Sequence, residues 1–208
     1  MVKGNTRQEI LNAALDLFSV QGFEATSISQ IADAVGIRKA TMYSHFSSKQ
    51  EILDALEQET LQLYEKRSIF ANADWDDPSF TKDKLNITPD VALQMITGQI
   101  RYIIHDPLIS KSRKMLTIEQ FRNPELKALQ TKQNYTDVMR YFTGLIKFLI
   151  RREKIIDGDA EIMAAQLCLP ISVWINLCDR EPEREDELIG LIERHVRQFF
   201  RTYGTRTR

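Results

Sequence analysis

A short segment with no acidic residue holds the side chains best suited to contact another molecule. Nothing acidic lies between Asp33 and Glu51, and positive charge in that interval comes from Arg38, Lys39 and Lys49. The side chains that helical spacing turns outward are Lys39, Thr41, Tyr43 and Ser44. For His45 two interpretations have equal support: an outward contact, or a hydrogen bond within the domain. Hydroxyl groups and cations can bind base edges and phosphates, so this segment predicts a small nucleic-acid-binding face.

Composition limits the class of protein. The 208 residues are 43% hydrophobic and 27% charged with a net charge of −1, which excludes a disordered chain and a uniformly basic nucleic-acid binder. Gly and Pro number only 8 and 6, and such scarcity of turn formers favours long helices over a many-stranded sheet. We therefore expect an all-α fold with one local basic face.

Enzymatic chemistry has little support. The chain has none of the common phosphate-loop, dinucleotide, nucleophile-elbow or zinc-protease motifs, and its three histidines are far apart. Cys168 and Cys178 are ten residues apart on an expected helix, about 15 Å, which is too far for a disulfide. We expect free thiols, no metal, no cofactor and no catalytic activity. No signal peptide or membrane-spanning segment is expected, so we predict a cytoplasmic protein.

Helix boundaries are clearest at the N-terminus. Three capping boxes begin at Thr6, Ser27 and Ser48, and Gly22 and Gly36 supply left-handed stops. They predict a first helix, a helix-turn-helix over about 27–46 and a long helix to residue 67. Further helices are expected near 90–105, 108–121, 124–152, 159–179 and 184–203, with a linker from Ile69 to Pro89. The predicted division is residues 1–47 as the helix-turn-helix domain, 48–67 as a linking helix and 68–208 as a helical effector-binding and dimerisation domain.

The N-terminal segment also carries a family pattern. The motifs A-x-x-L-F, G-F-x-x-T-S-I, I-A-x-A-x-G and T-x-Y-x-H-F occur in "ILNAALDLFSVQGFEATSISQIADAVGIRKATMYSHFSSKQEILDAL". This quarter of the chain resembles the tetracycline-repressor (TetR) family of bacterial transcription regulators. The resemblance implies a third helix in the major groove, a ligand-binding core and a dimer built on the last two helices. Carried over by position, the implied DNA-binding residues are Ser27, Ser29, Arg38, Lys39, Ala40, Thr41, Tyr43, Ser44, His45 and Lys49.

Three positions depart from the family pattern and affect operator choice. Arg38 stands where Ser or Thr usually caps the third helix, Ala40 replaces a frequent Gly, and Met42 replaces Leu or Ile. The resemblance implies that Tyr43 and Lys49 contact phosphates. For Lys49 the helix dipole agrees, because a lysine at a helix start is unfavourable unless an anion lies nearby.

The C-terminal two-thirds offer two further sets of candidates. Aromatic and Met residues at helical spacing are mostly core, but some could line a cavity for a small apolar or aromatic effector. The ligand-binding candidates are Tyr102, Met115, Phe121, Tyr135, Met139, Phe142 and Trp174. The last helix is apolar over a broad face, which suggests a twofold dimer, the alternative being a buried helix in a monomer. The dimerisation candidates are Ile171, Trp174, Leu188, Ile192, Phe199, Phe200 and Tyr203.

These observations favour a ligand-responsive transcriptional regulator. We expect a repressor that binds a near-palindromic operator as a homodimer and is released by a small-molecule effector. Two alternatives remain. One is an adaptor that keeps the fold but recognises a protein, and the other is a small-molecule-binding or catalytic helical protein.

Overall fold

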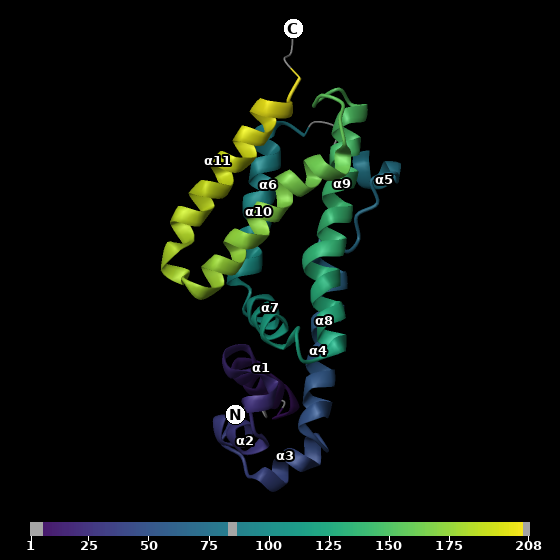
Figure 1. Cartoon of the computed structure of the whole chain (residues 1–208). Coiled ribbons are helices and arrows are strands. Elements are labelled where there is room, and N and C mark those ends of the chain that lie inside the picture. The colour runs from purple at the N-terminus through teal and green to yellow at the C-terminus, as the bar shows by residue number, and fades with distance from the viewer. Residues whose placement is uncertain (1–5, 83–86, 206–208) are drawn as a thin grey trace. The chain divides into compact units, whose positions relative to one another are not determined.

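The computed structural model describes residues 6–82 and 87–205, and these form an all-helical protein (Figure 1). Within those ranges the only β pairing is one isolated bridge, between Ile155 and Gly204. The expected all-α fold is confirmed. The helices fall into two compact units, which are considered separately below: Met1–Ser68 with Pro107–Gln130, and Ile69–Asp106 with Thr131–Arg208.

The first unit surrounds the N-terminal helix. It contains α1 (Thr6–Ala25), α2 (Ile28–Val35), α3 (Lys39–His45), α4 (Lys49–Arg67), α7 (Pro107–Glu119) and nearly all of α8 (Pro124–Thr131). Its core combines apolar side chains from all six helices: Ile10, Leu11, Ala14, Leu15, Phe18, Ile31, Ala32, Met42, Phe46, Ile52, Leu53, Leu56, Met115, Leu116 and Leu126. The sequence division assigned residues 107–130 to the C-terminal domain. The structure groups them with α1 because the buried side chains of α7 and α8 belong to this core.

Local hydrogen bonds explain where these helices begin. The Ser27 hydroxyl accepts from the Gln30 N–H (3.2 Å), and the Gln30 side chain accepts from the Ser27 N–H (2.7 Å), so the predicted capping box is confirmed. At α4, the Ser48 hydroxyl accepts from the Glu51 N–H (3.1 Å), but the Glu51 carboxylate binds Ser47 instead of Ser48. The sequence predicted Thr6 as the cap of α1, whereas the structure has Thr6 as the first described residue of the helix itself.

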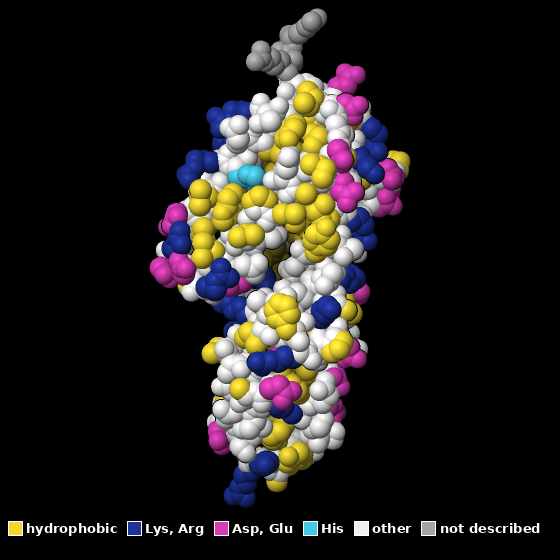
Figure 2. Space-filling model, viewed as in Figure 1, with side chains coloured by type: hydrophobic (Ala, Val, Ile, Leu, Met, Phe, Trp, Pro, Cys, Tyr) yellow, Lys and Arg dark blue, Asp and Glu magenta, His cyan; other side chains and the backbone are white. Residues whose placement is uncertain are grey.

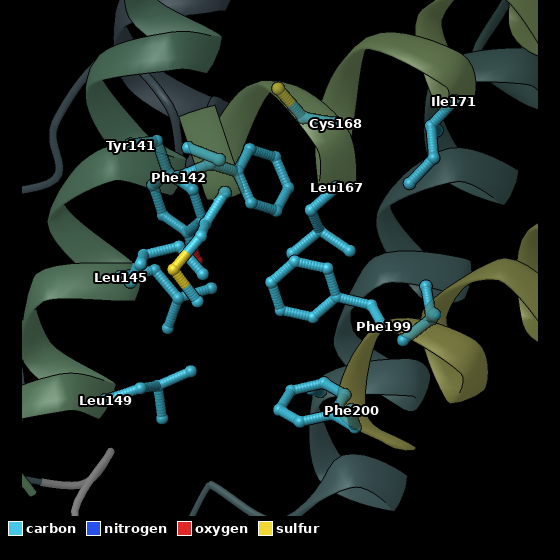
Figure 3. Close-up of a cluster of buried hydrophobic side chains, with 14 of the residues drawn as sticks. Tyr141, Phe142, Leu145, Leu149, Leu167, Cys168, Ile171, Phe199 and Phe200 are labelled. Carbon is cyan, nitrogen blue, oxygen red and sulfur yellow. The ribbon is translucent and has the colours of Figure 1, made fainter. Parts of the chain in front are cut away.

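The second unit contains α5 (Pro78–Thr81), α6 (Pro89–His105), α9 (Asp137–Arg151), α10 (Ala160–Arg180) and α11 (Glu185–Tyr203). A 3₁₀ turn at Pro182–Arg184 separates the last two helices. Figure 3 shows the heart of its core, where Tyr141, Phe142, Leu145 and Leu149 of α9 face Leu167 of α10 and Phe199 and Phe200 of α11. Both cysteines are buried and neither forms a disulfide, and burial raises the pKa of the Cys168 thiol to about 11.

The helix expected over 124–152 is interrupted. A π-helix, Lys132–Thr136, lies between α8 and α9. The ammonium of Lys132 contacts the Asp137 carboxylate at 2.7 Å, and Arg140 contacts it at 3.0 Å. This ion pair joins residues five apart, the spacing that a π-helix brings together, and it neutralises a carboxylate that is buried.

Part of the predicted linker is packed into the core. Trp75 is buried and makes ring contacts with Phe80, Tyr141 and Phe148 at centroid distances of 5.3 to 5.6 Å. It lies against Gly144 of α9, where a Cβ atom would come within 2.1 Å of the indole ring. The absence of helical periodicity around Trp75 concealed a side chain that the core requires.

α10 has an unusual composition. Among the described residues it is the one helix whose length and hydropathy would suffice to cross a membrane, and 33% of its apolar window is buried in the structure. The sequence analysis expected no such segment. One side of α10 packs into the core through Met163, Ala164, Leu167 and Ile171, and Pro170 lies inside the helix without ending it.

Candidate nucleic-acid interface

The helix-turn-helix is built on a buried support. α2 ends at Gly36, whose φ of 76° is the left-handed conformation that glycine adopts without strain. The Gly36 N–H donates to the Asp33 carbonyl (3.1 Å) and the Ile37 N–H to the Ala32 carbonyl (3.0 Å), which closes the turn. Met42 and Phe46 are buried against α1, so α3 is fixed by its inner face.

The outer face of α3 is polar and exposed. From Arg38 to His45 every residue except Met42 is exposed, and the Tyr43 side chain is 50% exposed. Arg38 provides no side-chain cap for α3, as its departure from the family pattern predicts. The Ser44 hydroxyl donates to the Thr41 carbonyl (2.7 Å), which leaves its oxygen lone pairs free to accept.

Charge around this face is mainly positive. In the described part of the chain neither Arg38 nor Lys39 forms a salt bridge, so both charges are available to an anion. The nearest following acid is Glu51, which accepts from the Ser47 hydroxyl (2.7 Å) and the Ser47 N–H (2.6 Å). These hydrogen bonds, with the side-chain bond first, lower the pKa of Glu51. Ser27 and Ser29 are exposed at the start of α2.

Lys49 has partners that the sequence analysis did not anticipate. Its ammonium donates to the carbonyls of Phe23 (2.6 Å) and Thr26 (2.8 Å) and lies 4.1 Å from the centre of the Phe23 ring. The positive charge at the start of α4 therefore binds backbone oxygens at the end of α1. In this structure the Lys49 ammonium links α4 to the end of α1 and is already hydrogen-bonded, so it is not available to a phosphate.

The ligand-binding candidates are divided between the two units. Met115 is buried in the first core, and Phe121 lies in the same unit with 89% of its side chain exposed. Tyr135 is exposed in the second unit. Of the four remaining candidates, all in the second unit, Met139 and Phe142 are buried, and Tyr102 and Trp174 are partly buried. The structure thus does not bring the seven residues together, because helical spacing does not show which core a helix enters.

Two buried polar atoms in the second unit were not predicted from the sequence. Tyr102 was a candidate for its aromatic ring and not for its hydroxyl, and Gln133 was not a candidate. Tyr102 Oη and Gln133 Nε2 are buried and have no hydrogen-bond partner among the described residues. Buried polar groups are nearly always paired in native proteins, so such atoms point to a missing partner. Gln133 lies in the π-helix, a type of irregularity that is often found at functional sites.

The dimerisation candidates mostly face inward. Ile171, Leu188, Ile192, Phe199 and Phe200 are all buried within the second unit, as the close-up shows for Ile171, Phe199 and Phe200 (Figure 3). Trp174 and Tyr203 are partly buried against the same core. The five buried side chains are covered by their own unit, whereas Trp174 and Tyr203 keep part of their surface exposed.

The opposite side of α10 provides another apolar surface. Ile162 is 55% exposed, Val173 is 63% exposed, and Leu169 between them is half-buried. Their spacing of seven and four residues places them on one side of the helix, named here the α10 stripe. Figure 2 shows hydrophobic side chains gathered over the surface where α10 and α11 run. The signal in the sequence was that α10 is apolar on both sides.

The exposed helix-turn-helix of α2 and α3 places the chain in the class of helix-turn-helix folds, and comparison with known proteins shows which family its N-terminal segment matches. Residues 10–56 match the family model for bacterial regulatory proteins of the tetR family. Over 47 residues the chain is 45% identical to the transcriptional regulator TcmR of Streptomyces glaucescens, and over 54 residues it is 41% identical to the repressor KstR2 of Rhodococcus jostii. These matches cover 23% and 26% of this chain, and only 21% and 26% of the two relatives.

Solved structures resemble the chain over nearly its whole length. A protein of Mesorhizobium loti described as a TetR-family transcriptional regulator has a TM-score of 0.61 at 20% identity and covers 99% of this chain and all of its own. SmeT, the repressor of a multidrug efflux pump in Stenotrophomonas maltophilia, has a TM-score of 0.61 at 18% identity, covering 97% of this chain and 92% of SmeT. A complex of SmeT with triclosan gives 0.57 at 19% identity, covering 96% and 92%. The match to the tetR family model thus covers residues 10–56, and these solved structures share the fold of the whole chain.

Proposed function

We propose that the chain is a sequence-specific DNA-binding transcriptional repressor. The observation that supports this most strongly is the exposed polar face of α3, held by the buried side chains of Met42 and Phe46. α3 would enter the major groove as the recognition helix, with Lys39, Thr41, Ser44 and His45 toward the bases and Arg38 and Tyr43 toward phosphates. Ala40 would allow close approach, and Ser27 and Ser29 would contact the backbone from α2. Repression is the activity of two relatives, KstR2 and SmeT.

The repressor would act as a homodimer that binds a near-palindromic operator. Two recognition helices related by twofold symmetry read half-sites about one DNA turn apart. The α10 stripe supports a second copy of the chain as its partner. In a twofold contact the α10 stripe would meet the same stripe of the second copy. The apolar side chains of Ile162, Leu169 and Val173 would then be buried against one another.

An effector of the repressor would bind within the second unit. The buried side chains of Met139 and Phe142 and the partly buried ones of Tyr102 and Trp174 favour an aromatic or apolar molecule. The unpaired Tyr102 hydroxyl and Gln133 amide favour one that also carries a polar group able to hydrogen-bond. Triclosan, which was solved bound to SmeT, is a probe of this kind. Release from DNA requires that the effector bind one conformational state more tightly than the other.

Binding to a library of bacterial genomic fragments tests the proposal. The full chain is incubated with the fragments at two salt concentrations, and recovered sites are sequenced. We expect short near-palindromes whose recovery falls as salt increases, because phosphate contacts release counterions. Lack of enrichment with folded, dimeric protein would contradict DNA binding in the effector-free state and would favour the adaptor alternative.

A further inference from the structure

The segment Gly22–Thr26, named here the α1–α2 joint, connects the body of α1 to the helix-turn-helix. α1 loses helical geometry at Gly22, where φ is 83° and ψ is 166°. Ser27, the cap of α2, follows directly after the joint. The Thr26 hydroxyl donates to the Gly22 carbonyl (2.7 Å) and closes the joint on itself. Its orientation therefore determines the direction in which α2 starts.

α7 holds the joint through a buried carboxylate. Glu119, the last residue of α7, is only 2% exposed, and its Oε1 accepts from the Phe23 N–H at 2.8 Å. The approach needs a glycine next to it: a Cβ atom at Gly22 would lie 2.7 Å from this same oxygen. A buried carboxylate is costly unless it is paired, so Glu119 stabilises the unit only while Phe23 stays in place.

α4 holds the same peptide group from the other side. Lys49 donates to the Phe23 carbonyl, while Glu119 accepts from the Phe23 N–H. Glu119 of α7 and Lys49 of α4 thus both hydrogen-bond the backbone of Phe23. A displacement of α7 by about one ångström would carry the Glu119 bond beyond hydrogen-bond distance. The joint must therefore follow α7, or the Glu119 carboxylate loses the hydrogen bond from the Phe23 N–H.

We propose that Glu119 is a positioning residue that makes the α1–α2 joint follow α7 and thereby sets the separation of the two recognition helices in the dimer. This inference rests on the proposed function, because it needs an operator with two half-sites. Its consequence is that α7, and not only the long helix α4, passes conformational change to α3. The chain enters α7 at Pro107, directly after α6, the helix that carries Tyr102.

Variants that change either the charge or the length of the Glu119 side chain provide the test. Glu119→Asp keeps the charge but shortens the side chain, so it cannot reach the Phe23 N–H. Glu119→Gln loses the charge but keeps an oxygen acceptor at the same place. Ser112→Ala is the matched control, because it removes a buried hydrogen bond between α7 and Thr60 of α4 (3.0 Å) without touching the joint.

The affinity of each variant is measured for the selected operator and for derivatives with one base pair added or removed at its centre. We expect the wild type, Glu119→Gln and Ser112→Ala to prefer the selected separation. For Glu119→Asp the ratio of affinities between the selected and altered operators should fall by about fivefold or more. An unchanged ratio in Glu119→Asp, or an equal loss in Ser112→Ala, would overturn the inference.

Hydrogen exchange at the Phe23 amide gives a second measurement, made on the wild-type protein. Operator binding should slow this exchange by about fivefold or more, because a fixed α3 fixes the joint. Unchanged exchange on operator binding would contradict the role of the joint. If the genomic selection yields no near-palindrome at all, the proposed function fails instead, so the two failures are distinct.

Discussion

At the scale of single residues, the candidate interface depends on a few side chains whose charge is not used within the protein. Lys39 is exposed at the first position of α3 and forms no salt bridge in the described part of the chain. Lys49 has the same charge but donates to Phe23 and Thr26. The sequence predicted that both lysines contact DNA. The structure distinguishes them, because only the Lys49 ammonium binds backbone carbonyls of the protein.

Replacement of Lys39 tests this distinction. Lys39→Ala should weaken operator binding roughly three- to tenfold at 0.1 M salt and reduce the slope of log affinity against log salt by about one. Fluorescence anisotropy across a salt series measures both quantities. Lys147→Ala, which removes an exposed lysine in the second unit, is the control and should leave the slope unchanged. A full wild-type slope in Lys39→Ala would exclude a phosphate contact.

Glu57 on α4 makes stability depend on pH. Burial, with repulsion from Glu125 and Asp54, raises its pKa from 4.5 to about 7, and its Oε1 has no hydrogen-bond partner among the described residues. The folded chain binds this proton more tightly than the unfolded chain does. The contribution of Glu57 to stability is therefore most favourable below pH 4.5 and is lost as the pH rises from 4.5 to 7.

Glu57→Gln should remove this loss. Because Glu57 is half-buried and screened by solvent, we expect the variant to be more stable than the wild type by about 1–2 kcal/mol at pH 8. At pH 4.5 the two should be nearly equal. Urea unfolding at both pH values measures the difference, with Glu24→Gln, an exposed carboxylate of the same unit, as control. A gain of equal size at both pH values would contradict the shifted pKa.

At the scale of elements, two glycines in helices show how packing decides the effect of the same substitution. Gly144 of α9 lies against the Trp75 ring, whereas Gly98 of α6 has no heavy atom within 4 Å of its Cβ direction. Both helices belong to the second unit. The sequence predicted a helix at both positions but gave no sign that Trp75 crosses one of them.

Gly144→Ala and Gly98→Ala should therefore have opposite effects. The methyl group at 144 would displace the indole and lower the free energy of unfolding by about 2–3 kcal/mol. At 98 the alanine should raise it by about 0.5–1 kcal/mol, because alanine favours helix and nothing obstructs it. Thermal unfolding followed by circular dichroism measures both. Equal effects of the two substitutions would show that Trp75 does not pack on α9 in solution.

At the scale of the whole molecule, the proposed function needs a second copy of the chain and an effector. The surface that we propose for the second copy is the α10 stripe, because the apolar side chains Leu188, Ile192, Phe199 and Phe200 of α11 are buried in their own unit. Val173 is 63% exposed near the middle of α10 and would lie close to a twofold axis on this stripe.

A charge on the stripe should separate the dimer. Val173→Glu places two carboxylates in an apolar contact and should raise the dissociation constant of the dimer at least about tenfold. Light scattering after size-exclusion chromatography measures the mass at several concentrations. Val20→Glu, at an 81% exposed position of the first unit, should leave the mass unchanged. If Val173→Glu stays dimeric as the wild type does, the α10 stripe is not the dimer contact.

The effector proposal predicts a response to a phenolic probe. Triclosan should raise the melting temperature of the chain and weaken operator binding, and Tyr102→Phe should reduce its affinity by about tenfold, because a buried hydrogen bond is lost. Phe121→Ala is the matched control at an exposed position and should change neither value. Equal responses of the wild type and Tyr102→Phe would show that the Tyr102 hydroxyl does not contact the probe.

The sequence by itself determined the features that arise from neighbouring residues. The cap at Ser27, the turn at Gly36 and the alternation of buried and exposed residues on α3 depend on contacts within about four positions, so their pattern is visible in the chain. The resemblance to the family was visible for the same reason, since the motifs that carry it lie in that segment.

Only the tertiary structure decided which partner each apolar or charged face meets. Periodicity shows that a helix has an apolar side, but it does not show that Phe199 and Phe200 face their own core while Val173 is left outside. The bonds of Glu119 and Lys49 to Phe23 join residues 96 and 26 positions apart. Such contacts depend on how helices pack, and packing is set by the whole set of side chains at once.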